Sequence, residues 1–289
     1  TGATTQYSTD NATWSTTYAP VQGANTIYVR QQDVAGNSSA STAITFTLDT
    51  VAPTTPVVSL LTDTGTPPAG SASDKITSVE TLNVTPEASA LVEYKVGANA
   101  WTTTAPTGLA EGTQTVLVRQ TDLVGNVSST NTFTFTLDKT VAAPTVALAN
   151  DTGSSSTDKN TFDPTLSVSG ETGAQVQYSI DSGTTWVNSM PTLTDGAKAI
   201  KVRQTDVAGN VSSVTDYTFT LDRTGQPLTV ALVTDTFVAG NVATQTDKIS
   251  SNATLTINGL EAGSSWQYSV DNGVNWSAST LSATGTTFA

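Results

Sequence analysis

One nine-residue pattern returns along the chain and constrains its fold more than any other feature. Residues 29–37 read Val-Arg-Gln-Gln-Asp-Val-Ala-Gly-Asn, and closely similar segments occupy residues 118–126 and 202–210. A spacing of 89 and then 84 residues separates the arginines of the three copies, Arg30, Arg119 and Arg203. This spacing predicts a tandem array of one structural unit, with the length of a single β-sandwich module.

The residues that follow each copy alternate between apolar side chains and threonine. In residues 132–137, Phe133, Phe135 and Leu137 alternate with threonines, and residues 44–48 and 217–221 repeat the pattern. A period of two predicts strands with one buried face and one face in water. The chain holds 58 Thr, a residue that favours strands, and no window has a helical period. We therefore expect an all-β fold of antiparallel sandwiches with almost no helix.

Proline marks the boundaries between repeats. A Leu-Asp pair is followed each time by a short segment with proline, ending at Pro53, Pro144 and Pro227. Because proline lacks a backbone donor and favours extended backbone, these segments are predicted to be linkers. The expected domains are the C-terminal part of a repeat in 1–49, complete repeats in 50–138 and 139–222, and the N-terminal part of a repeat in 223–289.

The complete repeat in 50–138 is predicted to hold seven strands in Greek-key order. Its strands are expected at 57–61, 81–85, 91–96, 113–121 and 132–138, with short strands within 102–111. In that topology the loop after the first strand and the chain exit share one pole. Asp63, Asp74 and Asp138 should lie there and face Asp206 of the following repeat.

Composition excludes several classes of function. The chain has no Cys and no His, which removes Ser–His and Cys–His catalysis and disfavours zinc, copper and haem sites. A net charge of −13 repels phosphate, so we expect no nucleic-acid partner. No run of 18 apolar residues occurs, so we expect no membrane insertion.

Five short motifs together resemble one family of bacterial repeats. They are Asp-Thr-Gly at 151–153, Ser-Asp-Lys at 73–75, Tyr-Ser-Ile-Asp at 178–181, the nine residues at 202–210 and Thr-Phe-Thr-Leu-Asp at 218–222. This set resembles the bacterial Ig-like repeats of giant non-fimbrial adhesins secreted through type I systems. The resemblance implies tandem Ig-like β-sandwiches in a linear rod, secreted and retained at the bacterial surface, with calcium bound by repeated aspartates. Phe237 in place of Gly153, and a linker at Arg223 without Ala-Pro, depart from the pattern.

Twelve of the 18 aspartates occupy four repeat positions. Calcium takes six to eight oxygen ligands in flexible geometry, so repeated loop carboxylates favour it over magnesium. Aspartate also opens turns by accepting hydrogen bonds from its own backbone, which is the alternative for any single position. The predicted metal ligands are Asp33, Asp122 and Asp206; Asp49, Asp138 and Asp222; Asp63, Asp151 and Asp235; Asp74, Asp158 and Asp247; and the amides Asn126 and Asn210. Those asparagines, like Asn37, could instead serve left-handed backbone.

Other repeated residues have structural interpretations. The arginines of the nine-residue pattern are expected to pair with a carboxylate across the sheet, and Asp10, Asp181 and Asp271 to form hairpin turns. The recurring tryptophans are expected to pack in the core or at its edge rather than to serve as sugar-stacking platforms: Trp14, Trp101, Trp186 and Trp276.

Two functions fit these features. The first is a non-enzymatic spacer that is stiffened by calcium. Such a spacer presents an adhesive tip and supports contact with host epithelial cells. The alternative is an Ig-like module that itself binds a glycan or protein of the host surface. An enzyme is disfavoured because the same carboxylates recur in every repeat. The expected partners are neighbouring repeats, a host glycan or protein, and a second copy in head-to-tail contact, with 223–289 completing 1–49.

Overall fold

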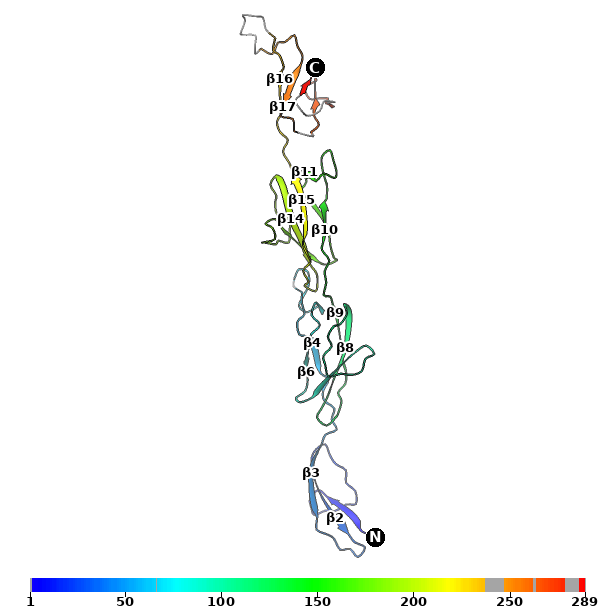
Figure 1. Cartoon of the computed structure of the whole chain (residues 1–289). Helices are drawn as coiled ribbons and strands as arrows, with labels where there is room; N and C mark the ends of the chain where they lie inside the picture. Colours follow the sequence, from blue (N-terminus) through cyan, green and yellow to red (C-terminus); the bar gives the residue numbers. More distant parts are fainter. Residues whose placement is uncertain (1, 66, 237–246, 262–263, 279–285, 289) are drawn as a thin grey trace. The chain divides into compact units, whose positions relative to one another are not determined.

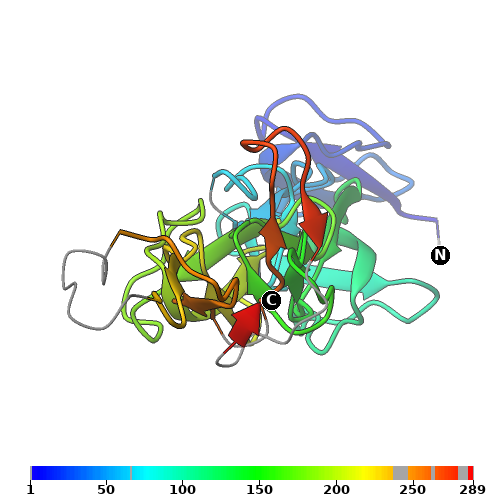
Figure 2. The ribbon, with the colours of Figure 1, turned by 90° about the horizontal axis from the view of Figure 1, so that it is seen from above.

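The computed structural model describes residues 2–65, 67–236, 247–261, 264–278 and 286–288. Only strands, turns and loops occur in these residues, as the two perpendicular views in Figure 1 and Figure 2 show. The all-β prediction is therefore confirmed. Within the described residues no helix has the length and apolar character that a membrane crossing requires.

Residues 57–137 form a sandwich of two sheets. The smaller sheet pairs β4 (Val57–Leu60) with β6 (Leu82–Thr85) in antiparallel register. The larger sheet has the order β5-β9-β8-β7, drawn from β5 (Ile76–Thr77), β7 (Leu91–Val96), β8 (Gly112–Thr121) and β9 (Asn131–Leu137). β5 runs parallel to β9, whereas β8 runs antiparallel to both of its neighbours.

The core of this sandwich lies between the two sheets. Val116 and Val118 of β8 and Phe133, Phe135 and Leu137 of β9 are buried together. Side chains of β4 and β6, among them Leu60 and Leu82, pack against them. The threonines that alternate with the phenylalanines point to the opposite face, as the period of two predicted.

The next residues repeat this order of strands. A two-stranded sheet joins β10 (Thr145–Leu148) with β12 (Leu166–Ser169). A four-stranded sheet has the order β11-β15-β14-β13, from β11 (Asn160–Thr161), β13 (Gln175–Ser179), β14 (Gly196–Thr205) and β15 (Thr215–Leu221). Val202 and Leu221 are fully buried, at the positions of Val118 and Leu137.

Residues 1–49 contribute a single three-stranded sheet. Its order is β1-β2-β3, with β1 (Thr4–Ser8), β2 (Gly23–Gln32) and β3 (Thr42–Leu48). The apolar stripe of β3 was expected on a buried face, yet Ile44 is 57% exposed. The predicted strand is present but its predicted buried face is not, because the described residues of this segment form no second sheet to cover the stripe.

The described residues after 228 form two small sheets. The first has the order β16-β17-β20, from β16 (Thr229–Leu232), β17 (Leu255–Asn258) and β20 (Thr286–Phe288). The second pairs β18 (Gln267–Tyr268) with β19 (Ser277–Ala278). The predicted aspartate Asp247 lies at the edge of the described residues, because 237–246 fall outside them.

Two details differ from the sequence-based expectation. The short strands predicted within 102–111 are absent, and this segment makes only an isolated bridge between Tyr94 and Thr102. The parallel strand β5 was not anticipated, because two residues are too short to show an alternation.

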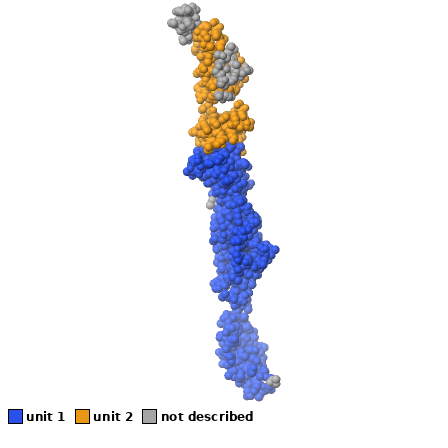
Figure 3. All heavy atoms as spheres, in the orientation of Figure 1, with its two compact units in different colours: residues 1–147, 168–191, 200–217 blue, residues 148–167, 192–199, 218–289 orange. Residues whose placement is uncertain are grey.

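The chain comprises two compact units: residues 1–147, 168–191 and 200–217, and residues 148–167, 192–199 and 218–289 (Figure 3).

Candidate metal centre at a junction between repeats

The loop after β14 is closed by a pair of side chains, Asp206 and Asn210. The two carboxylate oxygens of Asp206 accept hydrogen bonds from the backbone N–H and the side-chain amide of Asn210, each at 2.7 Å. The backbone N–H of Asp206 donates to the carbonyl of Asn210 at 3.0 Å. Asp206 is only 1% exposed, so the structure holds a carboxylate in a buried and fixed position.

Asp138 lies beside this loop, directly after β9 of the preceding repeat. Its backbone N–H donates to the carbonyl of Thr77, which sets the end of the strand. Its carbonyl oxygen accepts a hydrogen bond from the side-chain amide of Asn210 at 2.9 Å. The repeated Asp and Asn positions therefore meet across the junction, and the Asp138 carboxylate is half-buried there.

Glu171 supplies a third carboxylate that the sequence analysis missed. It lies between β12 and β13, and its backbone N–H donates to the side chain of the buried Gln204 at 3.0 Å. The amide of Gln204 in turn donates to the carbonyl of Ala142 in the linker, at 2.8 Å. A periodic signal existed, because glutamate recurs with spacings of 84 and 90 residues at Glu87, Glu171 and Glu261.

Asp138, Glu171 and Asp206 form one acidic cluster. One carboxylate oxygen of each lies within 4.8 Å of the others. Burial, followed by the charge of Asp206, raises the pKa of Asp138, and Thr140 N–H opposes this only in part. Partial loss of hydration of its carboxylate also raises the pKa of Glu171, with the charges of Asp138 and Asp206 adding to the effect. The ion pairs within the described residues neutralise none of the three. The cluster can hold a divalent cation.

The predicted ligands of the first loop in each repeat follow a different arrangement. Asp63 accepts the backbone N–H of Lys75, while Asp74 accepts that of Ile76. The same pairs recur between Asp151 and Lys159, Asp158 and Asn160, Asp235 and Lys248, and Asp247 and Ile249. In each repeat the Oδ1 atom of the first aspartate is buried and accepts no hydrogen bond: Asp63, Asp151 and Asp235. None of these aspartates joins a three-carboxylate group in the residues that the structure describes.

The remaining predicted ligands lie at the earlier and later repeats. Asn126 donates its amide to Asp122 and to the carbonyl of Asp49, at 2.8 and 3.3 Å. Burial opposes ionisation of Asp122, but hydrogen bonds from Asn126 outweigh it and lower the pKa of that carboxyl. Asp33 is exposed and bonded to Asn37, which lowers its pKa. Asp222 is exposed and accepts the N–H of Thr224.

The repeated arginines have two kinds of partner. Arg119 forms the expected cross-strand ion pair, with Glu93 at 2.9 Å. Arg30 and Arg203 donate to glutamines at the equivalent position, Gln6 and Gln177. Each arginine also stacks on the recurring tryptophan, with 3.9 to 4.2 Å from guanidinium carbon to ring centre: Arg30 on Trp14, Arg119 on Trp101, Arg203 on Trp186. These three tryptophans are half-buried at the edge of the core, whereas Trp276 is exposed.

The three hairpin aspartates form turns as predicted. Asp181 accepts hydrogen bonds from Thr185 and Ser179, which lower its pKa to about 2. Asp271 is bonded by Asn275 and Ser269, with the same effect. Hydrogen bonds from Thr13 lower the pKa of Asp10. The carboxylate oxygens of these three aspartates therefore accept hydrogen bonds within their own turns.

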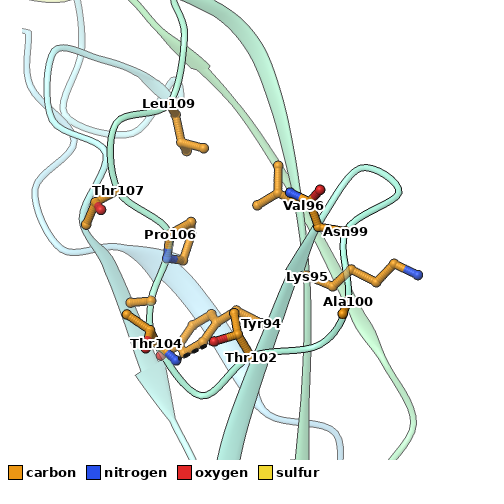
Figure 4. Close-up of a pocket in the computed structure, with 11 residues that line it drawn as sticks. Tyr94, Lys95, Val96, Asn99, Ala100, Thr102, Thr104, Pro106, Thr107 and Leu109 are labelled. Atoms are coloured by element: carbon orange, nitrogen blue, oxygen red, sulfur yellow. Dashed lines mark hydrogen bonds between the residues drawn. The ribbon is translucent and has the colours of Figure 1, made fainter.

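A hollow of about 280 Å³ lies between β7 and the segment that follows it (Figure 4). Tyr94, Val96, Pro106 and Leu109 line it, and Lys95 is the one charged residue of its lining. Carboxylates are absent from this lining, so paired acid–base chemistry has no residues here. The acidic cluster at Asp138 remains the better candidate for a functional site.

Comparison with protein families gives a match for one of the sandwiches. Residues 55–139 match the family model of the bacterial Ig-like domain. The same order of strands follows in residues 145–221, so the matched module is succeeded by a second sandwich of the same topology. Asp138, in the first module, is thereby brought to the loops that carry Glu171 and Asp206 in the second.

The curated relatives are proteinases of much greater length. The PI-type proteinase of Lactococcus lactis subsp. cremoris is 29% identical over 211 residues, which cover 68% of this chain and 11% of the proteinase. The PIII-type proteinase of strain SK11 is also 29% identical over 211 residues, with 68% and 10% covered. The chain thus spans about a tenth of the length of the curated relatives it matches.

Solved structures of fibronectin-like modules are also similar. Fibronectin(III)-like modules of Clostridium thermocellum CbhA are 16% identical, with a TM-score of 0.33, over 57% of this chain and 94% of that one. The FN1–FN3 domains of chicken CNTN1 are 12% identical, with a TM-score of 0.29, over 76% and 91%.

Proposed function

We propose that the chain is a spacer segment of a secreted adhesin held at the bacterial surface, in which calcium ties consecutive Ig-like repeats into a stiff rod. The tandem modules, and the relation to long lactococcal proteinases, support a repeat region of a surface protein. The spacer acts without catalysis: it presents a distal adhesive part to host cells.

One observation carries the cation assignment. Three carboxylates from two consecutive repeats converge at the junction, and Asp206 is almost fully buried there. Like charges at this separation repel and would push the repeats apart if no cation were present. A bound calcium would reverse the sign of that interaction and favour the docked junction.

The residues fit the chemistry of calcium. Carboxylate oxygens are its preferred ligands, and an exposed Glu171 leaves room for the water molecules that complete six to eight contacts. Each oxygen of Asp206 keeps acceptor capacity beside its bond from Asn210. Magnesium fits less well, because it demands a tighter octahedral shell and keeps most of its own water.

Calcium titration of the full chain by calorimetry tests the proposal. We expect Glu171→Gln and Asp206→Asn to weaken or abolish the heat of one site. Asp216→Asn is the matched control, since it removes one negative charge from an exposed strand position of the same repeat. Equal calcium affinity in the native chain, Glu171→Gln and Asp206→Asn would refute a site at this cluster.

A further inference from the structure

We infer that the loop between β4 and β5, described at residues 61–65 and 67–75, is a selective docking surface for the loop after β14 of the next repeat. It accepts the sequence Asp-Val-Ala-Gly-Asn of residues 206–210 and excludes Asp-Leu-Val-Gly-Asn, the sequence of residues 122–126. The inference rests on the tandem repeats of the proposed spacer and is independent of a bound cation. The sequence of the β4–β5 loop then determines which repeat can follow in the chain.

A hydroxyl group orients the contact. Thr64 Oγ donates to the carbonyl oxygen of Ala208, 144 positions later in the chain. The same hydroxyl accepts the backbone N–H of Ser78 at 2.7 Å, so its remaining donor direction is set by its own repeat. The β4–β5 loop therefore presents a fixed donor to the backbone of the following repeat.

Two glycines allow the backbones to approach. A Cβ atom at Gly65 would lie 2.5 Å from the carbonyl oxygen of Val207, and one at Gly70 would lie closer still. From the other side, a Cβ at Gly209 would lie 3.0 Å from the backbone nitrogen of Gly65. The distances at Gly65 and Gly70 are too short for a real Cβ, and the one at Gly209 is tighter than most real Cβ contacts, so this surface is shaped by the absence of side chains.

The third residue of the docked loop decides the fit. Ala208 is completely buried in this contact, whereas Val124, at the equivalent position of residues 122–126, is 63% exposed. Valine at 208 would add two methyl groups where no exposed surface remains to receive them. Overpacking of this kind displaces backbone. Alanine also stands at position 35, so residues 33–37 carry a sequence that this surface would accept.

The docking surface is a property of this loop and not of every repeat. Lys75 follows its bonded Asp63 by 12 positions, whereas Lys159 follows Asp151 by only eight. The shorter loop retains Gly153 but has no second glycine before Lys159. A Cβ at Gly153 would meet nothing closer than 4.0 Å. Selection of the next repeat is thus encoded separately in each loop.

Spin-label distance measurement on the full chain tests this pairing. The chain has no cysteine, so Thr132→Cys and Ser189→Cys place single labels at exposed positions of the two repeats. We expect one narrow distance peak with the native loops. Ala208→Val, the pair Val207→Leu with Ala208→Val, and Gly70→Ala should each shift the mean distance and remove that peak. Ala35→Val makes the same change in an exposed copy of the pentapeptide and should leave the peak intact.

The variants distinguish this inference from the cation site. All are measured with excess calcium and with chelator, and circular dichroism checks that each sandwich is folded. Should Ala208→Val unfold its repeat, Gly70→Ala decides, because it alters the other repeat. If the distance peak of the native chain is unchanged by chelator but is lost in Ala208→Val and Gly70→Ala, the result supports the pairing of the two loops and contradicts the cation site. An unchanged peak in folded Ala208→Val or Gly70→Ala overturns the pairing.

Discussion

Asn210 joins two repeats through one side-chain amide, which donates to the Asp206 carboxylate at 2.7 Å and to the Asp138 carbonyl at 2.9 Å. Asn126 makes the equivalent bonds to Asp122 and Asp49, the second at a longer 3.3 Å. The asparagine at the end of the nine-residue pattern is therefore a connector between repeats. Its role as a direct metal ligand is not needed to explain its recurrence.

Removal of this connector should loosen the junction. Asn210→Ala removes the side-chain amide that donates to the buried Asp206 carboxylate and to the Asp138 carbonyl. We expect a loss of about 1–3 kcal/mol in the stability of the repeat that carries Asp206. Asn126→Ala should have a smaller effect, because Asp122 is less buried than Asp206 and the bond to Asp49 is longer. Chemical denaturation of both variants measures this difference, and equal losses would contradict the assignment.

The acidic cluster predicts a dependence on pH. Burial and neighbouring carboxylates raise the pKa values of Asp138 and Glu171 above their ordinary 3.8 and 4.5. Because the docked state disfavours their ionised forms, the cation-free junction is more stable at low pH and loses stability as the pH rises through these raised values.

Protons should also compete with the cation. Calcium binds the ionised carboxylates, so its affinity should fall as the pH is lowered from about 7 toward the raised pKa values. Calorimetric titration of the full chain at several pH values tests this. Asp216→Asn should leave the trend unchanged, while constant affinity across the range would argue against ligation by these carboxylates.

The sandwich of residues 57–137 should be sensitive to one face of β9 only. Leu137 is fully buried, so Leu137→Ala should cost about 2–5 kcal/mol. Thr134 points to the exposed face, and Thr134→Ala should cost less than about 1 kcal/mol. A chain of several modules need not unfold in one transition, so the transition that Leu137→Ala shifts must be identified in the full chain. Similar shifts in both variants would contradict the assigned faces.

The stack of Arg203 on Trp186 should be measurable as a coupling. The guanidinium carbon lies 4.1 Å from the ring centre, and Gln177 rather than a carboxylate is its other partner. A double-mutant cycle with Arg203→Ala and Trp186→Leu should give a coupling of about 0.5–1 kcal/mol. A coupling near zero would show that the two side chains act independently.

Much of the fold follows from local patterns. The alternation in residues 132–137 predicted β9 and its buried face, because a period of two directly reports which side chains share a face. β5 could not be found in this way, since its two residues are fixed by a parallel pairing with β9. The apolar stripe of β3 was found, but its exposure depends on which sheet covers it and not on the alternation itself.

The candidate site was only partly accessible from the sequence. Asp138 and Asp206 were expected to face each other, because they end a strand and follow one in a repeated pattern. Glu171 was missed, since its neighbours differ between repeats and only its spacing to Glu87 and Glu261 marks it. Asp63 and Asp74 share the same pole in the topology, yet their hydrogen bonds serve their own loop. Topology assigns residues to a pole, but side-chain packing decides which of them meet.

Calcium at Asp138, Glu171 and Asp206 is proposed to hold two repeats in a fixed relation. The most direct test is the distribution of distances between spin labels at Thr132→Cys and Ser189→Cys, recorded with calcium and after chelation. Calcium is supplied well above the roughly 10⁻⁴–10⁻³ M dissociation constants of extracellular sites. We predict a narrow distribution with calcium that broadens on chelation, and no calcium response in Glu171→Gln. A distribution that is the same with calcium and with chelator would contradict the account.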